Sequence, residues 1–170
     1  MQRPPHAKDL RKGRYSEPNA RYFVTFNTVA PTPSISEVSY FQSLSTAVFE
    51  MESAKQLSEA SFTVMPDHVH LLFRLGSTLT LSQAIAKLKQ RSRGSARVNP
   101  LHWQNGFHDH KLRNDSELHP ILHYMYLNPY RARLLDQGSI WHYVHVEPSA
   151  WNWIQPLLLK DCPYPEWLTD

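Results

Sequence analysis

Two short β-rich runs, separated by a proline–aspartate pair, constrain the fold of this chain more than any other feature. Residues 61–65 read SFTVM and residues 68–75 read HVHLLFRL, and both runs are rich in β-branched, aromatic and other apolar side chains. Pro66-Asp67 between them is a turn signal. The two runs are therefore predicted to pair as the antiparallel strands of a hairpin.

Helical periodicity flanks this hairpin on both sides. Before it, Ile35, Val38, Phe41 and Leu44 recur at helical spacing after Ser34, a residue suited to capping. After it, Thr80 precedes a second periodic run. In chain order the predicted elements are a strand over 22–29, a helix over 34–57, strands over 61–65 and 68–75, a helix from 80 to about 100, a strand over 103–112 and a helix from Asp115 to about 127, just before Pro129.

This order is the βαββαβ pattern of ferredoxin-like α+β folds, in which an antiparallel sheet carries its helices on one face. The last helix is an addition to that pattern, and a C-terminal tail follows it. We expect a basic N-terminal arm over 1–20, one domain over 21–137, and a Trp- and Pro-rich tail over 138–170 that packs on the domain. Many functions use this fold, so the fold alone does not decide what the chain does.

The distribution of charge favours a polyanionic partner. The 170 residues include 18 Lys and Arg and 15 Asp and Glu, a net charge of only +3. Basic side chains nevertheless concentrate in two stretches, 3–14 and 87–97, which is typical of a protein that binds a polyanion. A solvated helix face would give the same pattern. The clustered residues are Arg3, Lys8, Arg11, Lys12, Arg14, Lys87, Lys89, Arg91, Arg93 and Arg97.

Cysteine content and hydropathy exclude several protein classes. Cys162 is the only cysteine, which excludes a disulfide within the chain and a cysteine-based zinc ribbon. No stretch approaches the ~20 consecutive apolar residues of a membrane-spanning helix. The basic start has no apolar segment behind it, unlike a secretory signal. We therefore expect a cytoplasmic protein.

A His-x-His motif opens the second hairpin strand. Side chains two residues apart on a strand share a face, so His68 and His70 are predicted to lie together while Val69 points into the core. Two imidazoles on one face can bind a divalent metal ion. The alternative is a polar pair on a solvent-facing strand.

A tyrosine and an asparagine share a face of the last predicted helix. Tyr124 and Asn128 are related as i and i+4, whereas Tyr126 lies about 200° around the helix from Tyr124. A tyrosine hydroxyl can serve as a covalent nucleophile, and the asparagine could supply an oxygen ligand or orient a substrate. The alternative is a core tyrosine followed by an asparagine that caps the helix before Pro129.

Four segments together resemble one enzyme family. They are MPDHVHLLF, the basic helix that follows it, GFHDHKLRND and YMYLNPYRARL, in this order and at the expected spacing. The chain resembles the REP-associated tyrosine transposases, within the single-tyrosine HUH transposases, over about residues 11–135. Arg133 departs from the family, which usually has Gly there.

The resemblance implies a role for each matching residue. His68 and His70 would be metal ligands, Tyr124 the nucleophile and Asn128 the third ligand. The implied reaction cuts single-stranded DNA beside short imperfect palindromes, leaving a 5′-phosphotyrosine and a free 3′-OH. The implied cofactor is Mg or Mn, whereas ligand softness alone would favour Mn or Zn.

The implied partner is single-stranded DNA that carries a REP- or BIME-type hairpin, bound by a nucleoid-associated monomer or homodimer. Two alternatives are a domesticated hairpin-binding protein with little or no turnover, and a metallonuclease that uses water and does not need Tyr124. The residues expected to bind DNA are Arg11, Lys12, Arg14, Lys87, Lys89, Arg91, Arg93 and Arg131.

Overall fold

The computed structural model describes residues 16–29, 35, 38–93, 101–135 and 139–158. Arg11, Lys12 and Arg14, the predicted cap Ser34, most of the N-terminal arm and the end of the tail lie outside these residues.

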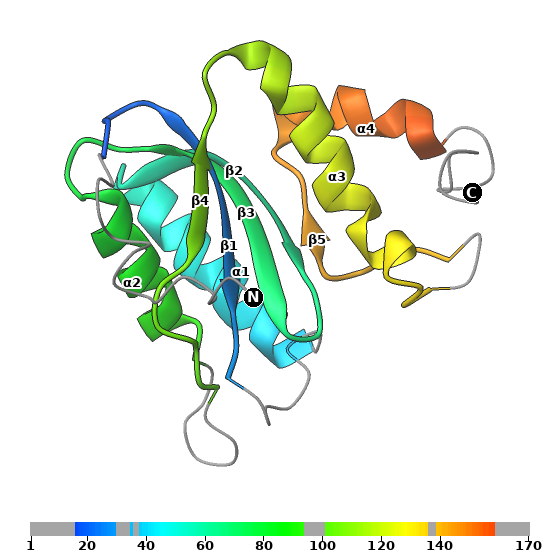
Figure 1. The fold of residues 1–170 in the computed structure, drawn as a ribbon, viewed down its shortest axis with the longest axis horizontal. Coiled ribbons are helices and arrows are strands. Elements are labelled where there is room, and N and C mark those ends of the chain that lie inside the picture. Colours follow the sequence, from blue (N-terminus) through cyan, green and yellow to red (C-terminus); the bar gives the residue numbers. More distant parts are fainter. Residues whose placement is uncertain (1–15, 30–34, 36–37, 94–100, 136–138, 159–170) are drawn as a thin grey trace, which may run out of the picture.

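An antiparallel sheet of five strands, in the order β4-β1-β3-β2-β5, forms the centre of the described structure (Figure 1). The predicted α+β fold with a central β2–β3 hairpin is therefore confirmed. The strands are β1 (Arg21–Asn27), β2 (Leu57–Val64), β3 (His68–Leu75), β4 (His108–Lys111) and β5 (Val144–His145). The helices are α1 (Val38–Ser53), α2 (Leu81–Arg91), α3 (Leu118–Arg131) and α4 (Trp151–Leu158), with short 3₁₀ turns η2 (Asp115–Glu117) and η3 (Pro148–Ala150).

The sheet separates two hydrophobic cores. The larger core lies between the sheet and the helices α1 and α2, which run behind the sheet in Figure 1. The smaller core lies on the other face, where Leu72 of β3 packs with Leu122 and Tyr126 of α3 and Ile154 of α4. The two helices of the βαββαβ pattern thus share one face as expected, and the added helix α3 occupies the opposite face.

Several predicted boundaries were wrong, for local reasons. The first helix does not reach Leu57, because Lys55 adopts a left-handed φ of 55° and the chain then enters β2 at Leu57. The next helix ends at Arg91 rather than near Pro100, although its predicted cap Thr80 is confirmed and forms a capping box with Gln83.

The strand predicted over 103–112 is only the four residues of β4. Trp103 contributes an isolated bridge to Thr28 instead of extending the strand. The predicted strand 22–29 is β1, which spans Arg21–Asn27 and so begins one residue earlier and ends two residues earlier. Strand β3 has the predicted bounds.

Helix α3 starts later and ends later than predicted. Asn114, not Asp115, caps the 3₁₀ turn η2 that precedes it. The helix then continues through Pro129 to Arg131. Just beyond, Arg133 has a left-handed φ of 54°. The usual glycine of the resembled family thus falls at a position where glycine is favoured.

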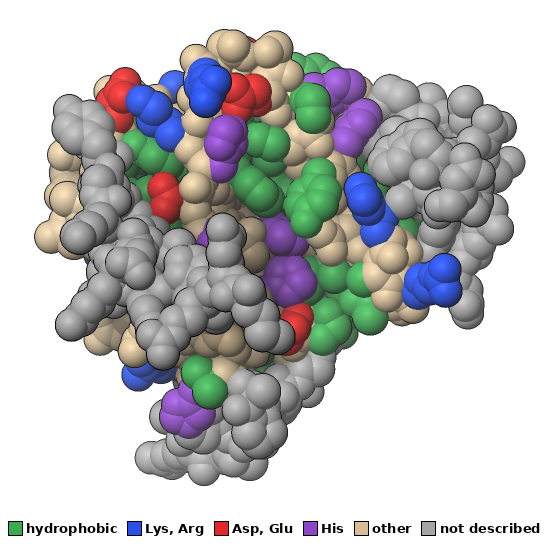
Figure 2. All heavy atoms as spheres, in the orientation of Figure 1, with side chains coloured by type: hydrophobic (Ala, Val, Ile, Leu, Met, Phe, Trp, Pro, Cys, Tyr) green, Lys and Arg blue, Asp and Glu red, His purple; other side chains and the backbone are tan. Residues whose placement is uncertain are grey.

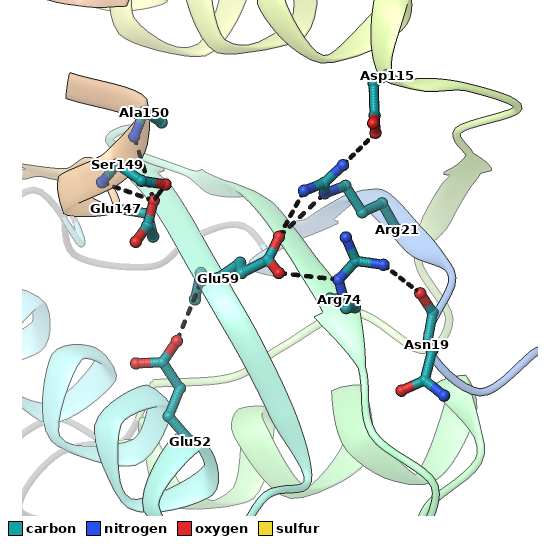
Figure 3. A network of polar contacts seen from close by, with 10 residues as sticks. Asn19, Arg21, Glu52, Glu59, Arg74, Asp115, Glu147, Ser149 and Ala150 are labelled. Atoms are coloured by element: carbon teal, nitrogen blue, oxygen red, sulfur yellow. Dashed lines mark hydrogen bonds and ion pairs between the residues drawn. The ribbon is translucent and has the colours of Figure 1, made fainter. Parts of the chain in front are cut away.

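Ion pairs tie together three strands of the sheet at the end distant from His68 (Figure 3). Glu59 lies in an irregularity of β2, with a left-handed φ of 54°. Its carboxylate accepts hydrogen bonds from Arg21 of β1 and from Arg74 of β3. Arg21 also contacts Asp115 at the start of η2. This network joins the sheet to the segment that leads into α3.

Among the described residues, no helix has both the length and the apolar character needed to cross a membrane.

Candidate active site on the α3 face of the sheet

Strand β3 places His68 and His70 on the face of the sheet that α3 covers. Val69 between them is buried in the larger core on the other face. The Nε2 atoms of the two histidines lie 3.1 Å apart. The two imidazoles therefore converge as the i, i+2 spacing predicts, while their role as metal ligands stays a prediction.

Hydrogen bonds hold the outer nitrogen of each ring. His68 Nδ1 donates to the Asp67 carboxylate over 2.7 Å, and His70 Nδ1 is hydrogen-bonded to Thr25 Oγ1 at 2.8 Å. Thr25 can reach His70 because the two residues are directly opposite in the β1–β3 register. With each Nδ1 occupied, both Nε2 atoms face one point, which is how histidines are oriented around a bound metal.

Helix α3 brings Tyr124 and Asn128 to the same point. The Asn128 amide nitrogen lies 3.1 Å from His70 Nε2, and the Tyr124 ring centroid lies 5.3 Å from that of His70. Phe23 of β1 completes the cluster, because it stacks on the His70 ring at 5.5 Å and meets the edge of Tyr124 at 6.1 Å. Side chains from β1, β3 and α3 are thus packed around His70.

Tyr124 differs from the other tyrosines of its helix in exposure. Its side chain is 39% exposed, while Tyr126 and Tyr130 are buried in the smaller core. Burial, together with the nearby Tyr130, raises the pKa of Tyr126 to about 12. The Tyr130 hydroxyl donates to the backbone carbonyl of Ser139. Of these three phenols, only Tyr124 combines solvent access with a position beside the histidines.

The environment of His70 keeps its imidazole neutral. Burial, and then the electrostatic effect of the neighbouring His68, lower the pKa of His70 to about 3. A neutral imidazole retains the lone pair that binds a cation.

The converging groups fit an open metal site rather than a closed one. Two imidazole nitrogens and one amide meet at His70 Nε2. In the described part of the chain, no three His, Cys, Asp or Glu side chains are grouped to hold a metal ion. A 180° turn of the Asn128 amide would present its oxygen in place of its nitrogen. This donor set suits a divalent ion that takes its remaining ligands from water or substrate oxygens.

The sequence of the domain matches a known transposase family. Residues 39–126, just over half of the chain, match the family model described as "Transposase IS200 like". The chain belongs to the IS200-like transposases. No curated protein matches the chain in sequence.

A solved structure agrees with this assignment at the level of the fold. A REP-associated tyrosine transposase bound to a REP hairpin has 21% identity with this IS200-like transposase and a TM-score of 0.65, over 77% of this chain and 79% of the other. A proposed transposase from Deinococcus radiodurans R1 has 15% identity over 73% of this chain and 95% of the other, with a TM-score of only 0.38, too low to show a shared fold.

The open surface of the IS200-like transposase around this site is visible in Figure 2. Histidine side chains lie at the middle of the face and also toward its upper and lower ends, with hydrophobic side chains between them, and Lys and Arg side chains lie at the upper left and on the right. Arg131 is one of the predicted DNA contacts, and its guanidinium lies 5.9 Å from the Tyr124 ring centroid. Arg131 therefore belongs to the candidate site.

The basic residues of α2 lie elsewhere. Helix α2 packs on the face of the sheet opposite to the histidines. Lys87 donates to the Gln56 side chain, Lys89 donates to two backbone carbonyls, and Arg91 pairs with Glu50. Arg93 is exposed just beyond the helix. Contact of these four residues with DNA stays a prediction, and it requires DNA that extends beyond the α3 face.

Sequence reasoning missed the residues that support the site. Phe23 and Thr25 are separated from His70 by more than forty positions, and only the β1–β3 register brings them together. Local rules identify Asp67 only as a turn residue, although its position next to His68 is a usable signal for a hydrogen bond to that imidazole.

Proposed function

We propose that this IS200-like transposase cuts single-stranded DNA beside REP-type hairpins and becomes covalently joined to the new 5′ phosphate through Tyr124. The observation that carries the proposal is the exposed Tyr124 beside the His70 ring, with Asn128, one helical turn further, at His70 Nε2. The similar fold that was solved with a REP hairpin supports the choice of DNA partner.

In the proposed reaction, the Tyr124 hydroxyl attacks the scissile phosphorus and the bond from phosphorus to the 3′ oxygen breaks. The phenolic proton passes to water, and the departing 3′ oxygen takes up a proton from water. One phosphate ester replaces another, so the bond energy is kept in the phosphotyrosine. Attack by a second 3′-OH can then rejoin the strand without ATP.

His68, His70 and Asn128 would hold the Mg or Mn ion that this reaction requires. When bound, the ion polarises the scissile phosphate. The neutral state of His70 keeps its Nε2 lone pair available at physiological pH. Asp67 and Thr25 orient the two rings through their Nδ1 atoms.

Arg131 and Phe23 would contribute to the site without reacting. The Arg131 guanidinium, near the Tyr124 ring, would neutralise charge on the phosphate that the tyrosine attacks. Phe23 packs against both Tyr124 and His70, so it limits the movement of one ring relative to the other. Both effects would hold the Tyr124 hydroxyl and the scissile phosphate in the geometry for attack before the reaction begins.

A single strand suits this site better than a duplex. The phosphate must approach a tyrosine carried by α3 and a histidine pair carried by β3 at the same time. A flexible strand can be drawn between the two elements, whereas a stacked duplex backbone restricts the in-line approach. Binding through Lys and Arg contacts to phosphates should weaken steeply as salt increases.

The decisive experiment is covalent trapping on labelled oligonucleotides. A 3′-labelled single strand with a REP-type hairpin is incubated with the protein and Mg or Mn, then resolved on a denaturing protein gel. We expect a labelled adduct that Tyr124→Phe reduces by at least about 10³-fold, with hairpin binding nearly unchanged. The matched control, Tyr126→Phe, should keep the adduct because Tyr126 is buried.

Three outcomes would contradict the proposal in different ways. Hairpin binding without any adduct would indicate a DNA-binding protein without turnover. Metal-dependent cleavage that persists in Tyr124→Phe would indicate hydrolysis by water. Equal cleavage of the single strand, its annealed duplex and a strand with a scrambled hairpin would indicate a non-specific nuclease.

A further inference from the structure

A proline inside α3 leaves one backbone carbonyl of the helix without its usual donor. Pro129 has no N–H, so the carbonyl of Met125, four residues earlier, lacks the donor that an α-helix normally supplies. Met125 follows Tyr124 directly, and Asn128 comes three residues later. The vacant acceptor therefore lies between the two functional residues of the helix.

A buried threonine on the sheet occupies that acceptor. The Thr63 hydroxyl of β2 donates to the Met125 carbonyl over 3.0 Å, and Thr63 is 0% exposed. Thr63 is also directly opposite His70 in the β2–β3 register. The hydrogen bond thus links the residue paired with His70 in the sheet to the turn of α3 that contains Tyr124.

We propose that Thr63 is a positioning residue that sets the location of α3 relative to the histidine pair, a role that rests on the proposed function. The apolar contacts of α3 with the sheet are not directional, so they resist separation more than sliding or rotation. A hydrogen bond to one defined carbonyl is directional. It specifies which turn of α3 lies over His70, and therefore where Tyr124 and Asn128 are placed.

The test is a double-mutant cycle between Thr63 and Pro129. Thr63→Val keeps the side-chain shape and removes the donor, and we expect it to slow adduct formation at saturating DNA by about 10- to 100-fold. DNA affinity should change by less than about twofold, because most of the predicted phosphate contacts lie outside α3. Mn affinity should fall less than the rate does, because His68 and His70 stay in place and Asn128 is the one proposed ligand that moves with α3. Thr63→Ser restores a hydroxyl and should recover most of the rate.

Pro129→Ala supplies the missing helical donor to Met125. The new donor competes with Thr63 for that carbonyl, so Pro129→Ala should itself slow adduct formation. In that background Thr63→Val should cost no more than about threefold in addition, because Thr63 no longer anchors α3 through Met125. Ser61→Ala is the matched control. Ser61 is also buried on β2, and its hydroxyl accepts a hydrogen bond from the Glu147 amide. We expect this control to keep the adduct rate while it loses a buried hydrogen bond.

Hydrogen exchange of the α3 amides provides a readout that does not depend on activity. The backbone amides of residues 122–128 should exchange faster in Thr63→Val than in Ser61→Ala when the two variants are compared at equal global stability. Any of three results would overturn the proposal. They are equal exchange in the two variants, a wild-type adduct rate in Thr63→Val, and a Thr63→Val defect that is as large in the Pro129→Ala background as in the wild type. If the wild-type protein forms no adduct, the proposed function fails, while the exchange comparison still tests the anchor.

Discussion

His70 is the most buried of the candidate site residues, and its surroundings determine its charge. The side chain is 4% exposed, and it contacts Thr25, Phe23 and Asn128. Burial and the proximity of His68 lower its pKa to about 3. In an unfolded chain the same imidazole titrates near 6.5. The folded protein therefore binds one proton fewer than the unfolded chain between these two values.

This difference predicts a loss of stability in mild acid. Between pH 7 and pH 5 the unfolded state gains a proton at His70 and the folded state does not, so the free energy of unfolding should fall by about 2 kcal/mol through this residue. Urea unfolding of the metal-free protein at both pH values measures the change. Burial also lowers the pKa of His145, so His145 adds to this loss of stability, and it does so equally in wild type and in variants at other positions.

The comparison with His70→Gln isolates the contribution of His70. This variant should lose about 2 kcal/mol less than the wild type over the same pH interval. Parallel pH dependence in the two proteins would mean that His70 is not held neutral in the folded state.

At the scale of elements, the irregularity in β2 has a defined function in the sheet. It places the Glu59 carboxylate between arginines of β1 and β3, at the opposite end of the sheet from His68 (Figure 3). Burial raises the pKa of Glu59, but the hydrogen bonds and charges of Arg21 and Arg74 outweigh this effect and bring the pKa below its ordinary value. The ionised carboxylate therefore stabilises the folded state.

Replacement of this carboxylate should give a modest, pH-dependent loss of stability. Because the Glu59 side chain is 41% exposed, solvent screening limits the expected effect of Glu59→Gln to about 1 kcal/mol at pH 7. The difference from wild type should shrink as the pH falls below 4.5, where Glu59 itself becomes protonated.

Denaturant unfolding of three proteins checks this expectation. Glu50→Gln, which breaks the single exposed pair with Arg91 on the other face, serves as the control and should cost less than about 0.5 kcal/mol. A Glu59→Gln effect no larger than the control effect would show that the network does not act as a unit.

At the scale of the whole molecule, one chain supplies every part of the candidate site. The histidines belong to the central strand β3, and α3 packs on the same sheet through the smaller core. Tyr124 and Asn128 therefore reach the histidine pair without a second copy of the chain. This arrangement bears on the choice between a monomer and a homodimer that exchanges site residues.

Mixing two inactive variants tests the arrangement. A mixture of Tyr124→Phe and His70→Ala should form no adduct, because each site would still lack one of its own residues. Each variant mixed with wild type should leave the wild-type adduct yield intact, which controls for inhibition. His68→Ala in place of His70→Ala repeats the test with a more exposed histidine. Restored adduct in either mixture would indicate that α3 completes the site of a second chain.

Features that depend on short separations along the chain could be predicted from the amino-acid sequence alone. The bounds of β3, the common face of His68 and His70, and the helical turn between Tyr124 and Asn128 follow from backbone periodicities of two and 3.6 residues. The strand and helix order was sufficient to predict the α+β fold, because few topologies accommodate that order.

Contacts between residues that are distant in sequence could not be predicted, because they form only when the strands pair and the helices pack. Thr25 lies opposite His70 because of the β1–β3 register. Thr63 of the sheet contacts Met125 because α3 packs on that face of the sheet. The sheet also separates the basic helix α2 from the candidate site, although the two are close in sequence. By local rules Pro129 favours the end of a helix. The helix α3 nevertheless continues past it, because α3 packs against both the sheet and α4 and because the Thr63 hydroxyl donates to the Met125 carbonyl. Contacts of this kind depend on how strands pair and layers stack, which local periodicity does not encode.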